Sequence, residues 1–234
     1  AFKDSAMLAE LRRLLIAAET VLLITFPTLI SAEKVQCGPY VSVSSQNTET
    51  AEQVCTASRR ALALFESCGV PKILRPIQIN VVHDLKEGCV ALYHCGEDTI
   101  ELLEPSEMQE RRLPESAFSH LNIDEYFRSV VIHELTHAAN DGLPCPFESC
   151  VVADEYVAYS MQVMSLDTKS RQKFIERSGI QDRVSSEELS AIILFMAPDL
   201  FAQKVWAHLN QRENACRYID GLSSGKIVLD RGRF

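Results

Sequence analysis

Positive charge is scarce in this sequence: 23 Lys and Arg residues stand against 32 Asp and Glu residues, so the formal net charge is −9. An acidic chain repels a polyanion at long range, and no basic stripe offsets this repulsion. We therefore expect no nucleic acid among the partners. Internal repeats, low-complexity tracts and long linkers are also absent. With 234 residues, 47% of them hydrophobic, the composition fits a folded domain with a sizeable core rather than a disordered or fibrous protein.

A second absence concerns the cysteines, none of which stands in the Cys-x-x-Cys spacing of structural zinc sites. There are eight of them, all beyond residue 32: Cys37, Cys55, Cys68, Cys89, Cys95, Cys145, Cys150 and Cys216. An even number in this arrangement predicts disulfide bonds in an oxidising compartment. The full pairing cannot be deduced from the sequence. Cys145 with Cys150 and Cys89 with Cys95 are two plausible short-range pairs.

Residues 1–32 differ in composition from the rest of the chain. Arg12 and Arg13 precede an apolar run over residues 14–30, and Ser31 and Ala32 follow as the small residues that a signal peptidase prefers. We expect a signal peptide, and hence a secreted or periplasmic protein. Two alternatives stay open, an uncleaved N-terminal membrane anchor and an ordinary amphipathic helix. Glu19 interrupts the run, which is short for a membrane-spanning helix of about 20 residues.

The remaining residues, 33–234, change in pattern near their middle. Strand-like runs cover residues 35–44, 77–82, 89–95 and 99–103, and one helix capped by Thr48 or Thr50 reaches about Cys68, where Gly69 and Pro71 stop it. Helical patterns follow at residues 124–140, 151–166, 168–177, 185–197 and 199–220. Strands followed by helices predict an α+β fold in one domain. It has a small mixed or antiparallel sheet with a helix, followed by a C-terminal helical lobe.

The chemistry is concentrated in His133-Glu134-Leu135-Thr136-His137, within the first of these later helices. Two histidines four residues apart lie on one face of a helix, so both imidazoles can reach one metal ion. Glu134 then points toward a water molecule on that ion. Zinc lowers the pKa of such a water, and a carboxylate beside it can accept the proton. The pattern predicts Zn²⁺ held by His133 and His137, with Glu134 as the general base of a hydrolase.

A catalytic zinc of this kind takes three protein ligands, so one more must come from elsewhere in the chain. Glu155 is the best candidate, because it lies near the start of the next predicted helix, which the loop at residues 142–146 allows to fold back on the first. Asp154 and Glu148 are its rivals. The small residue Ala158 would permit close packing of the two helices.

These residues resemble a known family. The HELTH motif followed by Glu-Tyr-x-Ala-Tyr is similar to the gluzincin branch of the zincin metallopeptidases, and to exported bacterial proteins of that build. The resemblance covers about residues 130–162. It implies that His133, His137 and Glu155 bind zinc and that Glu134 is catalytic. The Gly and third His of the metzincin motif do not follow His137.

The leading hypothesis is therefore a zinc peptidase acting on a peptide or protein substrate, which could pair with an exposed strand edge near residues 99–103. A membrane would be involved only through an N-terminal anchor. Donors to a transition-state oxyanion could be Tyr156, Tyr159, Tyr218 or His208. His83 and His94, in strand-like segments, are expected to be surface or core residues. The alternatives are a catalytically inactive zinc-binding domain and a disulfide-stapled interaction module without metal.

Overall fold

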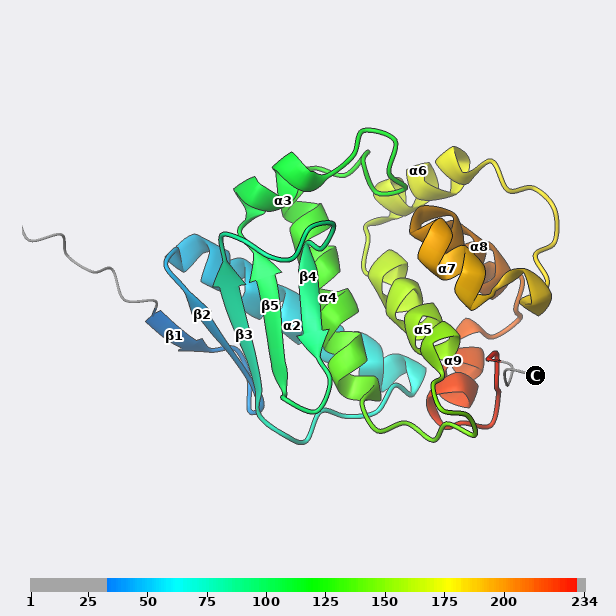
Figure 1. The fold of residues 1–234 in the computed structure, drawn as a ribbon, viewed down its shortest axis with the longest axis horizontal. Coiled ribbons are helices and arrows are strands. Elements are labelled where there is room, and N and C mark those ends of the chain that lie inside the picture. The colour runs from blue at the N-terminus through cyan, green and yellow to red at the C-terminus, as the bar shows by residue number, and fades with distance from the viewer. Residues whose placement is uncertain (1–32, 231–234) are drawn as a thin grey trace, which may run out of the picture. The chain divides into compact units, whose positions relative to one another are not determined.

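The computed structural model describes residues 33–230, which form an α+β fold as predicted (Figure 1). The predicted signal peptide or anchor, residues 1–32, lies outside the described residues. Five strands come first in the chain and most helices follow, so the sheet and the helical lobe occupy successive parts of the sequence.

The sheet is mixed, with the strand order β1-β2-β3-β5-β4. Strands β2 (Val41–Ser45), β3 (Ile77–Val82) and β5 (Thr99–Leu103) are parallel to one another, while β1 (Glu33–Gln36) and β4 (Ala91–His94) pair antiparallel at the two edges. The single strand predicted at residues 35–44 is wrong. It is a hairpin of β1 and β2, because the Gly38-Pro39 dipeptide reverses the chain and the N–H of Cys37 bonds the carbonyl of Val41 at 2.9 Å.

The predicted substrate edge at residues 99–103 is also wrong. The hairpin turn at residues 95–98 forms as expected, but β5 pairs on both sides, with β3 and with β4. The outer strand is therefore β4. Local hydrophobic pattern cannot reveal this order, since both strands of a hairpin look alike in sequence and only the pairing of β5 with β3 decides which one is buried.

Helix α2 (Thr48–Cys68) connects the parallel strands β2 and β3. Its N-cap is Asn47 and not the predicted Thr48 or Thr50, and the Asn47 side chain accepts bonds from the backbone N–H groups of Glu49 and Thr50. It ends as predicted at Gly69, which adopts the left-handed conformation (φ 70°) that suits glycine. This helix packs against β2 and against helix α4 (Ile123–Asn140).

The core lies between the sheet and these two helices (Figure 1). Val43, Ile79 and Leu102 on successive strands are fully buried, and Phe65 of α2 and Leu135 of α4 meet them from the helical layer. Burial of each such side chain contributes roughly 1.5–3 kcal/mol. The opposite face of the sheet carries a polar ladder, in which Ser42 donates to Gln78.

The helical lobe consists of helices α5 (Val151–Met164), α6 (Thr168–Ser178), α7 (Ala191–Met196), α8 (Pro198–Asn210) and α9 (Ala215–Ser223), with a 3₁₀ turn at Ser186–Glu188. The single helix predicted at residues 199–220 is wrong, because the chain turns between Gln211 and Asn214, and Asn214 caps α9. Helix α3 (Pro105–Arg111) was not expected. Among residues 33–230 no helix is long and apolar enough to cross a membrane.

Three disulfide bonds join Cys37 to Cys55, Cys68 to Cys216 and Cys145 to Cys150, which indicates an oxidising environment. The last of these was predicted. The predicted bond between Cys89 and Cys95 is absent, and both are free. The extended strand β4 lies between them, and its four residues alone span about 10 Å, beyond the roughly 7 Å that a disulfide allows between Cα atoms.

Candidate metal centre

Helix α4 carries the HExxH residues on a rigid, buried support. Asn122 caps its first turn by accepting a bond from the N–H of Glu125 at 2.9 Å. The apolar residues before His133 are buried, and so is most of the helix surface around the motif. His133 and Glu134 are only 9% and 8% exposed. A helix held this firmly fixes the direction of the side chains that it presents.

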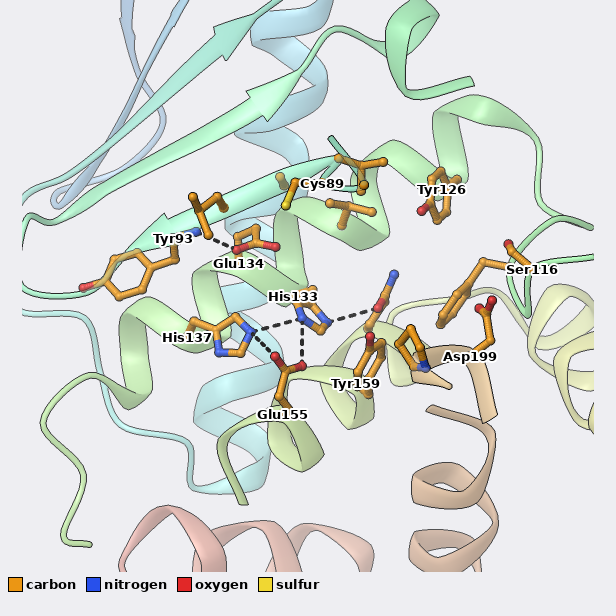
Figure 2. Close-up of a pocket in the computed structure, with 18 of the residues that line it drawn as sticks. Cys89, Tyr93, Ser116, Tyr126, His133, Glu134, His137, Glu155, Tyr159 and Asp199 are labelled. Atoms are coloured by element: carbon orange, nitrogen blue, oxygen red, sulfur yellow. Dashed lines mark hydrogen bonds and ion pairs between the residues drawn. The ribbon is translucent and has the colours of Figure 1, made fainter. Parts of the chain in front are cut away.

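Helix α5 follows the loop that the Cys145–Cys150 disulfide closes, and it packs against α4. Ala158 of α5 is fully buried. This packing brings Glu155 to the two histidines, as predicted. Ligand atoms of His133, His137 and Glu155 all lie within 4.8 Å of one another. Figure 2 shows the three side chains pointing toward one point of a pocket.

The distances within this cluster are short. The Nε2 atoms of His133 and His137 are 3.1 Å apart. The Glu155 carboxylate lies 3.5 Å from the Nε2 of His133 and 3.8 Å from that of His137. The rival Glu148 is exposed in the loop before α5 and lies outside the cluster. The rival Asp154 contacts the other nitrogen of His137 instead.

A buried hydrogen-bond chain assigns the tautomer of His133. The Ser129 hydroxyl donates to the Tyr126 carbonyl at 2.7 Å and accepts from the Gln162 amide nitrogen at 3.2 Å. The amide oxygen of Gln162 therefore faces the Nδ1 of His133, 3.1 Å away. An acceptor at this position requires Nδ1 to carry the proton. The Nε2 of His133 then presents a lone pair to the cluster.

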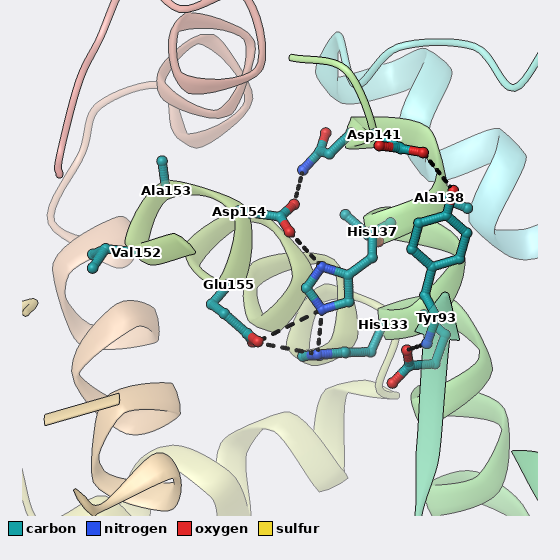
Figure 3. A network of polar contacts seen from close by, with 12 residues as sticks. Tyr93, His133, His137, Ala138, Asp141, Val152, Ala153, Asp154 and Glu155 are labelled. Atoms are coloured by element: carbon teal, nitrogen blue, oxygen red, sulfur yellow. Dashed lines mark hydrogen bonds and ion pairs between the residues drawn. The ribbon is translucent and has the colours of Figure 1, made fainter. Parts of the chain in front are cut away.

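A hydrogen bond to Asp154 orients the ring of His137 in a similar way (Figure 3). Its Nδ1 lies 2.8 Å from a carboxylate oxygen of Asp154, and the second oxygen of Asp154 accepts from the Asn140 side chain at 3.1 Å. Asp154 thus holds the proton on Nδ1 and directs the Nε2 lone pair inward. Metal-binding histidines in proteins are held by acceptors in this way.

The two Nε2 atoms and one carboxylate therefore converge on one point, and the surrounding carboxylates favour a positive charge there. Burial lowers the pKa of His137, but the hydrogen bond that Asp154 accepts and the charges of Asp154, Glu155 and Glu134 outweigh burial and raise it to about 9. The donor set of two imidazoles and one carboxylate is one that zinc accepts. The residues present thus fit a zinc ion.

Glu134 lies beside the cluster without belonging to it. One oxygen of its carboxylate accepts the backbone N–H of Tyr93, on the edge strand β4, at 2.9 Å. This bond fixes the carboxylate against the strand, and Glu134 lines the same pocket as the two histidines (Figure 2). The arrangement suits a proton acceptor held next to a metal ligand set.

The pocket has a volume of about 560 Å³ and extends well beyond the metal cluster. Strand β4 forms one wall, α4 and α5 form the floor, and the start of α8 and the loop after α3 close the far end, where Tyr126, Ser116 and Asp199 lie (Figure 2). The free thiols of Cys89 and Cys95 flank β4 along this wall. The cavity is large enough for several residues of a peptide.

Tyr159 is the one of the four predicted oxyanion donors that lines the pocket. Its ring packs edge-on against His133, with 4.6 Å between the ring centroids. Tyr156, Tyr218 and His208 form a separate cluster beneath α5, where the Tyr156 hydroxyl lies 2.8 Å from His208. These three do not line the pocket, so of the four candidates that the sequence leaves open Tyr159 is the one beside the cluster.

His83, which follows β3, and His94, in β4, lie outside the metal cluster. His94 pairs with Glu101 at 2.8 Å across the hairpin, and His83 is exposed. Sequence reasoning missed Gln162, although it follows Glu155 by seven residues and so lies on the same face of α5. It also missed Tyr93, for which only the tertiary structure provides a signal.

Comparison with known proteins gives one match. No curated protein and no solved structure is significantly similar to the chain. One family profile matches residues 41–232, a range that contains the whole sheet except β1, the metal cluster and the helical lobe. Because this match covers most of the chain, the protein belongs to the family of unknown function DUF6639.

Proposed function

We propose that this protein is a zinc-dependent hydrolase that cleaves peptide bonds, with zinc held by His133, His137 and Glu155 and with Glu134 as the general base. One observation carries the proposal. Three ligand atoms converge in the pocket, and a carboxylate that is not a ligand is fixed beside them by the backbone of an edge strand. The resemblance of the HELTH segment to gluzincins supports the same assignment.

Three ligands suit a catalytic rather than a structural zinc. Structural sites are closed by four protein ligands, whereas catalytic sites keep one position for water or substrate. Within residues 33–230 the cluster of potential metal ligands consists of three side chains, His133, His137 and Glu155. When bound, zinc would lower the pKa of a water molecule and polarise the substrate carbonyl.

Glu134 would move the proton. Its carboxylate accepts a proton from the attacking water and delivers it to the leaving amine nitrogen as the C–N bond breaks. The products are a carboxylic acid and an amine, so water supplies every atom that is added. The Tyr93 N–H holds one oxygen of Glu134 in place and leaves the other for the water.

Strand β4 would position the substrate. The N–H of Leu103 bonds the carbonyl of Val90, so along β4 the backbone groups of Ala91 and Tyr93 point away from β5. The N–H of Tyr93 reaches Glu134, and Ala91 remains as a backbone donor and acceptor at the pocket wall. An extended peptide can add to such an edge as a further strand.

Tyr159 would assist at the carbonyl oxygen. Its side chain lines the pocket next to His133, and within residues 33–230 its hydroxyl has no hydrogen-bond partner. A free hydroxyl beside the ligand set can donate to the negative charge that develops on the substrate oxygen. The three disulfides support a location in an oxidising compartment, and we propose that the protein is secreted, periplasmic or anchored outside the cytoplasm.

The test is Glu134→Gln in the full chain, assayed on a diverse peptide library with zinc quantified in each preparation. We expect hydrolysis to fall by about 10²–10⁴-fold while zinc stays bound, because the amide is nearly isosteric but cannot accept the proton. Glu148→Gln, in the loop before α5, is the matched control and should retain both zinc and activity.

The outcomes separate the candidate functions. Equal activity of the wild type and the Glu134 variant would show that Glu134 is not the base. Loss of zinc in that variant would make Glu134 a ligand and the site structural. A wild type that holds zinc but cleaves nothing in the library would favour the inactive zinc-binding domain, and a wild type without zinc would favour the interaction module.

A further inference from the structure

The carboxyl-terminal segment reaches the metal-ligand helix through one buried side chain, Asp230. One of its carboxylate oxygens accepts the backbone N–H of Val152 at 2.8 Å, and the other accepts that of Ala153 at 2.9 Å. Asp230 is only 8% exposed. These two amides belong to the first turn of α5, directly before Asp154 and Glu155, as Figure 3 shows.

Helix α5 has no cap of its own. Its N-cap position is Cys150, whose side chain makes no capping hydrogen bond because it is joined to Cys145. The N–H groups of a first helical turn need acceptors, and a carboxylate there also interacts favourably with the positive end of the helix dipole. Asp230, which is far from α5 in the sequence, provides both the acceptor oxygens and the negative charge.

The path of the tail toward α5 is well packed. After α9 the chain reverses, and the N–H of Ile227 bonds the carbonyl of Gly221 at 2.9 Å. Gly225 turns against Pro144, where an added Cβ would lie 3.0 Å from the Pro144 Cβ atom. Leu229 is buried next to Asp230. The family match also extends to residue 232, so this tail belongs to the domain that the family shares.

We infer that Asp230 is a positioning residue of the metal centre: by capping α5, it fixes the helical turn that presents Glu155 to the ion and Asp154 to His137. The inference rests on the proposed zinc site. Without Asp230 the buried N–H of Val152 and the partly buried N–H of Ala153 lose their acceptors, and the first turn of α5 frays. Both carboxylates then lose their fixed direction, while α4 and its histidines stay in place.

The chain offers a matched control in Asp167, which caps helix α6 by accepting the N–H of Ser170 at 2.7 Å. Helix α6 carries no residue of the metal cluster. Asp167→Ala therefore removes an aspartate cap without touching a ligand helix. Asp230→Asn is the conservative variant, since an amide retains one acceptor oxygen of the two.

The experiment measures the zinc dissociation constant of each full-length variant by competition with a chromophoric chelator, and the urea unfolding midpoint of each in excess chelator. We expect Asp230→Ala to bind zinc at least tenfold more weakly than the wild type, Asp230→Asn to be intermediate and Asp167→Ala to be within about twofold of the wild type. In the chelated form Asp167→Ala should lower the unfolding midpoint less than Asp230→Ala does, because Asp167 is exposed and caps through one amide, whereas Asp230 is buried and caps through two.

Wild-type affinity in both Asp230 variants, or equal weakening in Asp167→Ala, would overturn the inference and leave the proposed function intact. If Asp230→Ala does not fold, Asp230→Asn decides in the same way. A wild type that binds no zinc would overturn the proposed function together with this inference.

Discussion

His137 and Asp154 meet at 2.8 Å across two helices, through a bond that fixes which nitrogen of the imidazole can face a metal ion. The residue after Asp154 lies on the other side of that ring, 3.8 Å from its Nε2. Two neighbouring acids on α5 thus have separate roles, one orienting the histidine and one joining it in the cluster. Between Asp154 and Glu155, which the sequence leaves open, this geometry favours Glu155 as the third ligand.

Asp154→Asn should weaken zinc binding by about 10- to 100-fold without unfolding the protein. Asp154 accepts bonds from both His137 and Asn140, and an amide has a single acceptor oxygen, so one of the two contacts must fail. Competition with a chelator measures the effect, with Glu148→Gln as the control. Unchanged affinity would show that the orienting bond is not needed.

His133→Ala should remove zinc from the purified protein, because one of the three ligands is lost. Elemental analysis after dialysis gives the metal content. His94→Ala changes a histidine that pairs with Glu101 outside the cluster, and it should keep the full content. Full occupancy in the His133 variant would remove the proposed site.

Ala91→Pro should raise KM for peptide substrates several-fold and change kcat less. Proline removes the N–H of residue 91, which points away from β5 and makes no hydrogen bond within the sheet. Proline is tolerated at such positions on edge strands, so the fold should survive. Steady-state kinetics on one cleaved peptide tests this, and Ala91→Ser is the control. Identical KM values for both variants would argue against substrate pairing along β4.

Thiol counting on denatured, unreduced protein should find two reactive thiols, those of Cys89 and Cys95. The double replacement of these residues by Ser should reduce the count to zero. Eight thiols in the wild type would place the chain in a reducing compartment and contradict the three disulfides.

His208 should make the fold sensitive to acid. Burial, followed by the charges of Arg212 and Arg183, lowers its pKa from 6.5 to about 4. The unfolded chain therefore binds a proton that the folded protein resists, so the free energy of unfolding falls as pH decreases from 6.5 to 4. The slope from one such group is at most about 1.4 kcal/mol per pH unit.

Urea unfolding of the wild type and His208→Gln in excess chelator, at several pH values in this window, isolates the contribution of His208. The variant should lose less stability on acidification, since glutamine can bond Tyr156 and Arg212 without titrating. Parallel curves for the two proteins would assign the acid sensitivity to other groups.

Several features of the fold and site follow from patterns that act over short distances. The spacing of His133 and His137 places both on one face of α4 because helical periodicity is local. The breaks at Gly69 and at residues 142–146 also depend on neighbouring residues only, and so does the pairing of Cys145 with Cys150. The Glu155 prediction needed one further assumption, that α5 folds back on α4, and the two helices do pack in this way.

The remaining features join residues that are distant in sequence. Strand β4 becomes the edge because β5 pairs with β3, Cys68 finds Cys216 across 148 residues, and Asp230 caps α5 from beyond α9. No local pattern encodes these pairings, since each side chain taken alone is an ordinary strand, helix or tail residue. The sequence by itself determined which residues could bind a metal and share a helix face. The tertiary structure decided which acceptors orient them and which strand faces the pocket, because those contacts form only when the whole core packs.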